Sequence, residues 1–354
     1  MNSIVLAPYL KMLGCALLAL GARAANAQGR ADAVRPPSVG EAVSIRSAAL
    51  LVQAEASLTT IWPGFWPETL YLAIGPVRGG TLVIHPPGQA TAPDPRRFGV
   101  ELPKALVGRT FFDSERAPVT PFDFDFLVQG RRMLAVQPFG TFARRMGSDE
   151  VGWMRDSVAG QILFTVHEAF HGYQLKHFTW ERRQLLGTDL GRIRPHHALF
   201  DSSWVMKSLL AEREALHASL AAPSCRLARD GFASFHRLRQ RRLGSMPAVF
   251  DEFERYQELL EGVATWVGYE GLHRVVTAEK DGALRSVLRD LRFAYLKKDG
   301  EPYEGYELFL HYHIYVAGAA KTALLSRCGS PTWKSELQGG KSPQELLERW
   351  ITGE

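Results

Sequence analysis

The chain has 354 residues, of which 46% are hydrophobic and 22% are charged. This composition is typical of a globular protein with a core, and it excludes disordered and collagen-like chains. Lysine and arginine number 42 against 37 acidic residues, and the net charge of +5 is too small to predict a nucleic-acid partner.

Residues 1–27 have the pattern of a secretory signal peptide. A short uncharged run over 12–20 is followed by small residues that suit signal peptidase, and we expect cleavage after Ala27. The run is too short to span a bilayer and no later stretch is long enough, so we expect no stable membrane insertion after cleavage. The sequence therefore predicts a secreted or periplasmic protein.

The cysteines give a weaker signal about the compartment. Cys15 lies in a stretch that loosely resembles a lipoprotein signal, which is an alternative to cleavage after residue 27. The mature chain would retain only Cys225 and Cys328, and one disulfide between them is open to test by geometry.

Residues 28–150 predict a small β-rich amino-terminal lobe. Short apolar runs at 69–74, 81–85 and 132–137 are separated by glycine and proline, as expected for strands. Residues 122–126 alternate with period two, which is typical of a strand with one apolar face.

Residues 151–354 predict a larger helical lobe, so the expected fold class is α+β. The helical spacing is found in residues 151–176, 203–221, 225–242, 247–273, 282–294 and 305–327. A last short helix is expected from Ser342, which opens a capping box.

The first of these helices carries a motif with metal-binding spacing. Residues 167–171 read His-Glu-Ala-Phe-His, and residues four apart lie on one helix face, so His167 and His171 can reach one metal ion. Such a site with a position open to water suits Zn²⁺, and Glu168 projects toward that position as a general base. The alternative is a pair of ordinary core or surface histidines.

The third ligand decides the subclass. Glu261 precedes Gly262 and Ala264 on a later helix, and this EG-x-A segment together with HExxH resembles the gluzincins, in particular secreted bacterial peptidase-MA-like proteins. The resemblance implies a zincin-like fold in which His167, His171 and Glu261 bind zinc. The long interval before Glu261 departs from the usual pattern, and the alternative for this residue is an exposed helix carboxylate.

His177 is the competing third ligand. It stands ten residues after His167, as the third histidine does in metzincins. The glycine of that motif is replaced by Gln174, and no convincing Met-turn follows, so a helix-end histidine is the better interpretation.

Further residues are candidates for supporting roles. Glu212 and Glu258 could orient a ligating histidine, with surface salt bridges as the alternative. Tyr315 or His311 could stabilise the oxyanion, with core packing as the alternative. The arginine-rich run 236–243 is interpreted as a solvated helix face.

Together these features predict a secreted zinc metallopeptidase that acts on a peptide or protein substrate. Glu168 would serve as general base, and an edge strand such as 131–137 would align an extended peptide. The rival hypotheses are a non-catalytic zinc-binding protein on the same scaffold and a zinc hydrolase with a non-peptide substrate.

Overall fold

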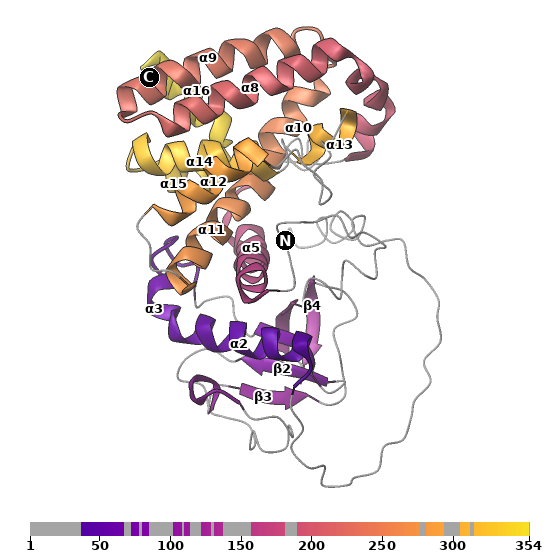
Figure 1. Ribbon diagram of the computed structural model, residues 1–354, viewed down its shortest axis with the longest axis vertical. Coiled ribbons are helices and arrows are strands. Elements are labelled where there is room, and N and C mark those ends of the chain that lie inside the picture. Colours follow the sequence, from indigo (N-terminus) through magenta and orange to yellow (C-terminus); the bar gives the residue numbers. More distant parts are fainter. Residues whose placement is uncertain are drawn as a thin grey trace.

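The computed structural model describes most of the chain after the expected signal peptide, which itself lies outside the described residues. The described ranges are 37–66, 72–77, 80–84, 102–107, 110–113, 122–128, 131–136, 157–180, 190–276, 281–293, 305–311 and 315–353. One small sheet lies at one end of the molecule, and a long helical hairpin lies at the other (Figure 1).

The described part begins with helix α2 (Val39–Gln53), followed by the short helix α3 (Glu55–Leu58). Ser38 caps α2: its Oγ accepts from the backbone N–H of Glu41 at 3.3 Å, and its own N–H donates to the Glu41 carboxylate at 2.7 Å. This reciprocal capping box satisfies two backbone donors at the start of the helix.

The strands form one five-stranded sheet in the order β3-β2-β1-β5-β4. They are β1 (Leu72–Val77), β2 (Gly80–Ile84), β3 (Thr110–Asp113), β4 (Phe122–Val128) and β5 (Arg131–Val136). The β1–β5 pair is parallel and the other pairs are antiparallel. Because β5 lies between β1 and β4, the expectation that residues 131–137 form an edge strand is wrong; the edges of this sheet are β3 and β4.

The predicted α+β fold with a separate β-rich amino-terminal lobe is also wrong, because helices make up most of the described residues. Periodicity predicts no helix before residue 151, yet α2 and the turn after α3 belong to the same core as the later helices. Ile45, Leu51, Trp62 and Phe65 are buried in that shared core. Hydrophobic burial therefore joins the two expected lobes into one packed unit.

Helix α5 (Val158–His177) is the centre of the molecule, and it is seen nearly end-on between the sheet and the other helices in Figure 1. The remaining helices are α7 (Leu190–Ile193), η3 (Arg194–Asp201), α8 (Ser203–Ala221), α9 (Cys225–Leu243), α10 (Val249–Gln257), η4 (Glu258–Gly262), α11 (Val263–Val276), α12 (Gly282–Phe293), α13 (Gly305–His311), α14 (Ala317–Cys328), α15 (Trp333–Gln338) and α16 (Pro343–Thr352), with the short η2 (Lys104–Leu106) before β3. Among the described helices, none has both the length and the apolar character needed to cross a membrane.

A disulfide joins Cys225, the first residue of α9, to Cys328, the last residue of α14. Their Cα atoms are 5.5 Å apart, and the bond closes a loop across 103 residues of sequence. The pairing that the sequence left open is thus present, and it ties the α8–α9 hairpin to the helix that packs beside it.

Candidate metal site

Two histidine rings meet on the buried face of α5. His167 and His171 are 3% and 5% exposed, and their Nε2 atoms lie 3.0 Å apart. The one-turn spacing of the two residues accounts for this geometry, because side chains at i and i+4 lie one above the other on a helix.

Glu261 brings a carboxylate to the same point from η4. Its Oε2 atom lies 3.2 Å from Nε2 of both histidines, and its side chain is 14% exposed. The segment is one turn of π-helix, in which the N–H of Val263 bonds to the carbonyl of Glu258, five residues back. Such wide turns inside α-helices are frequent at functional sites. The structure thus brings together three of the residues that the sequence singled out as ligands.

Gln174 links this π-turn to His171. Its side-chain N–H groups donate to the backbone carbonyls of Leu259 and Leu260 at 2.9 and 3.1 Å. Val263, which would bond to the carbonyl of Leu259 in an α-helix, bonds to that of Glu258 instead, and the Leu259 carbonyl accepts from Gln174. The Gln174 oxygen consequently faces Nδ1 of His171 at 2.8 Å, where it accepts the ring proton. In the neutral ring, this contact places the proton on Nδ1 and leaves the lone pair on Nε2 of His171.

Thr265 orients the other ring more weakly. Its hydroxyl donates to the backbone carbonyl of Glu261 at 2.7 Å, and its oxygen lies 3.5 Å from Nδ1 of His167. In the tautomer with its proton on Nδ1, His167 directs that proton toward the Thr265 oxygen and presents the lone pair of Nε2 to the metal position.

A positive charge among the three facing atoms is favourable, because lone pairs so close together repel in a buried site. The pKa values of His171 and Glu261 also show that positive charge is stabilised at this point. Burial opposes protonation of His171, but the Glu261 carboxylate, with smaller contributions from Glu168 and Gln174, more than offsets it and raises the pKa of His171 to about 9. Burial alone would raise the pKa of Glu261, yet the two histidines hold it well below its usual range.

The donor set fits Zn²⁺. Zinc prefers imidazole nitrogen and carboxylate oxygen, and bonds of about 2.0–2.1 Å in a tetrahedral site separate the ligand atoms by about 3.3 Å. The observed separations of 3.0–3.2 Å are close to that spacing. Three protein ligands also leave one tetrahedral position, which is the arrangement of catalytic zinc sites.

Glu168 lies beside this donor set without being part of the triangle. Its Oε1 atom is 3.9 Å from Nε2 of His167, and its side chain is 8% exposed. Burial raises the pKa of Glu168 to about 8, opposed by the charge of His171 and assisted by that of Glu261. A carboxylate with a pKa near neutrality can both take and return a proton.

The ring of Tyr315 packs near the same point, with its centroid 6.4 Å from that of His167. Burial raises the pKa of Tyr315 far above its usual value, and the charges of Glu261 and Glu168 add to this effect. Its hydroxyl therefore stays protonated and can donate a hydrogen bond. His311 is the last residue of α13, but its side chain lies outside the described residues.

His177 is not brought to the histidine pair. It is exposed at the end of α5, and its ring stacks on Tyr173 at 4.3 Å. The position at which the metzincin motif has glycine is occupied by Gln174, which orients His171. The geometry therefore favours Glu261 over His177 as the third ligand.

The two predicted supporting carboxylates have cationic partners rather than histidines. Glu212 accepts two hydrogen bonds from Arg242, at 2.6 and 3.0 Å, and Glu258 forms an ion pair with Lys321 of α14. Arg239 and Arg242 are fully buried, so the interpretation of run 236–243 as a solvated face is wrong for these two residues. Glu254 completes this group by pairing with both arginines. The acidic partners of these two arginines lie on other helices, so the run 236–243 by itself does not signal their burial.

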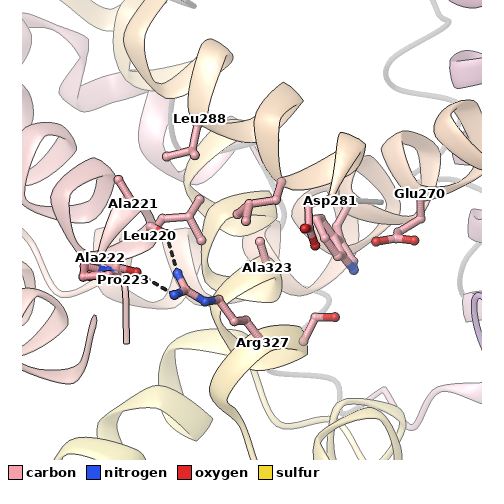
Figure 2. Close-up of a pocket in the computed structure, with 12 residues that line it drawn as sticks. Leu220, Ala221, Ala222, Pro223, Glu270, Asp281, Leu288, Ala323 and Arg327 are labelled. Carbon is pink, nitrogen blue, oxygen red and sulfur yellow. Dashed lines mark hydrogen bonds between the residues drawn. The ribbon is translucent and has the colours of Figure 1, made fainter. Parts of the chain in front are cut away.

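A separate cavity of about 490 Å³ lies among α8, α11, α12 and α14 (Figure 2). Its lining includes Trp266 and Glu270, which lie on the face of α11 opposite Gly268 and Gly271, the two glycines that contact α5. Arg327, also in the lining, donates to two backbone carbonyls at the end of α8. Helix α11 thus separates this cavity from the histidines.

Comparison with known proteins identifies no relative of this chain: no family model, no curated protein and no solved structure matches it.

Proposed function

We propose that this protein is a zinc-dependent hydrolase of the gluzincin type that cleaves peptide bonds. The observation that supports this proposal is the convergence of Nε2 of His167, Nε2 of His171 and Oε2 of Glu261 within 3.2 Å of one another. All three atoms are electron-pair donors that a divalent cation would satisfy.

In this proposal His167, His171 and Glu261 hold the ion. Zinc, when bound, supplies a Lewis acid that polarises a carbonyl and acidifies water. Glu168 accepts a proton from the attacking water as the oxygen–carbon bond forms. It then passes that proton to the leaving amine as the carbon–nitrogen bond breaks. Tyr315 donates a hydrogen bond to the oxyanion that develops on the carbonyl oxygen.

We further propose that the protein works in a secreted or periplasmic setting on peptide or protein substrates. The support is the signal-peptide pattern of residues 1–27 together with the Cys225–Cys328 disulfide, because structural disulfides persist in oxidising compartments.

The first experiment measures zinc per mole of purified mature protein at neutral pH. Wild type should hold about one zinc, whereas His167→Ala and Glu261→Ala should retain much less, because each removes a donor. His177→Ala is the matched control, since this histidine is exposed and stacked on Tyr173, and it should keep the wild-type content. A wild-type protein without affinity for zinc would contradict the proposal.

The second experiment tests catalysis with Glu168→Gln and a broad peptide library. The change keeps the size of the side chain and removes its basicity, so the variant should fold and bind zinc yet cleave about 10²- to 10⁴-fold more slowly. Equal rates for the variant and wild type would overturn the assignment of Glu168 as the base. Zinc binding without cleavage by wild type would instead support a non-catalytic zinc-binding protein.

A further inference from the structure

The π-turn η4 carries two carboxylates with different surroundings. Glu258 and Glu261 are its first and fourth residues. Glu261 faces the histidines, whereas the side chain of Glu258 is fully buried and pairs with the ammonium group of Lys321 from α14. Lys321 is fully buried as well, and its Nζ lies 4.9 Å from the centre of the Phe235 ring. The two carboxylates on the turn therefore have different partners, the histidine pair for Glu261 and Lys321 for Glu258.

The backbone of the turn is pressed directly against α14. A Cβ atom at Gly262 would lie 2.4 Å from Cα of Gly318, and one at Gly318 would lie 2.8 Å from Cα of Glu258. Such close approach requires glycine on both sides. The ion pair is formed one turn of α14 further along from this contact, because Lys321 follows Gly318 by three residues. The wide turn is thus attached to α14 both by its backbone and by a side chain.

On this geometry we infer that Lys321 and Glu258 form a positioning pair, which fixes the π-turn so that Glu261 reaches the metal site. The inference rests on the proposed zinc function. The pair has a second effect: it occupies Glu258, so that only one carboxylate of the turn is available to the ion. Glu258 bonds to Lys321 rather than to the histidines, so both residues of the pair act through Glu261.

Stability alone does not account for such a pair. Removing two charges from water costs several kcal/mol per ion, and a well-packed apolar pair is often as stable as a buried ion pair. The Glu212–Arg242 pair between α8 and α9 has equally buried partners, but it is not on the ligand-bearing turn. It therefore provides a control with matched burial and charge.

The experiment compares the metal affinity of Glu258→Gln and Glu212→Gln with that of the wild-type protein, by competition between zinc and a chromophoric chelator. Loss of an outer partner of a metal ligand typically weakens metal binding by about 10- to 100-fold, and we expect this loss for Glu258→Gln. Glu212→Gln should unfold at a lower temperature but keep the wild-type zinc affinity. Substitution of Co²⁺ for zinc adds a spectroscopic readout, and the visible bands should shift only in Glu258→Gln.

A double variant keeps the test valid if a single change impairs folding. Glu258→Gln with Lys321→Met removes both buried charges, and it should fold while still binding zinc weakly and showing the altered Co²⁺ bands. Wild-type affinity and bands in the folded double variant would overturn the positioning role and leave the proposed zinc site standing. A wild-type protein that binds neither metal would overturn the proposed function, and this inference with it.

Discussion

Gln174 shows how a single residue can decide the chemistry of its neighbours. Its amide is held by two backbone carbonyls of the π-turn, so its oxygen must face Nδ1 of His171. That contact selects the tautomer in which Nε2 of His171 carries the lone pair. One side chain thus couples the helix that carries the histidines to the turn that carries Glu261.

We expect Gln174→Ala to weaken zinc binding by about 10- to 100-fold, because the ring of His171 would lose the partner that orients it. Chelator competition at neutral pH measures this change. Gln161→Ala is the matched control: this glutamine is also buried on α5, but its side chain bonds to Thr165. Equal zinc affinities in the two variants would contradict the orienting role of Gln174.

At the scale of single residues, the sequence predicts contacts between side chains that a regular helical interval brings together. His167 and His171 follow from the four-residue interval, and Glu261 was reached through a family resemblance. Gln174 and Lys321 could not be found, because their roles depend on a π-turn that hydrophobic periodicity does not signal. The buried arginines were misjudged for a related reason: Glu212 lies 30 residues from Arg242, and no local pattern links them.

Among the elements, the crossing of η4 and α14 is the contact on which the site depends most. Gly262 and Gly318 allow the two backbones to approach, and Tyr315 lies three residues before Gly318, just ahead of α14. The crossing therefore sets the positions of the Glu261 carboxylate and of Tyr315 at once. Helix boundaries such as 203–221 were predicted correctly from spacing and agree with α8. Nothing in the sequence, however, pairs Gly262 with Gly318 of α14.

Gly318→Ala should destabilise the protein by about 1–3 kcal/mol, which is typical of inserting a methyl group into a packed interior. Its Cβ would lie 2.7 Å from Cα of Gly262, so the backbones must move apart. Urea unfolding measures the free energy. Gly40→Ala in α2 is the control, since a Cβ there meets nothing within 4 Å, and it should be neutral or stabilising by up to about 1 kcal/mol. Similar destabilisation by both changes would show that the crossing is not tightly packed.

At the scale of the whole molecule, the disulfide links two points that lie far apart in the sequence and so closes a large loop. Cys225 and Cys328 are 103 residues apart, and the enclosed chain includes α9 to α14. The bond restricts the unfolded chain far more than the folded one, which is the main source of its stabilising effect in the chain-entropy account.

Reduction of this bond should lower the free energy of unfolding by about 2–5 kcal/mol. The measurement is urea unfolding with and without dithiothreitol. Cys225→Ser with Cys328→Ser should reproduce the loss and make the protein insensitive to the reductant. A stability unaffected by dithiothreitol in the oxidised wild type would argue against the pairing.

The order in which the chain supplies the donor atoms has a consequence for biosynthesis. The histidines come first, Glu261 follows 90 residues after His171, and Lys321 comes 63 residues after Glu258. A nascent chain grows from its amino terminus, so a ribosome-bound fragment that stops before η4 contains both imidazoles but not the Glu261 carboxylate that completes the triangle. Assembly of the donor set is thus a late event, because the three atoms cannot meet until about three quarters of the 354-residue chain has been made.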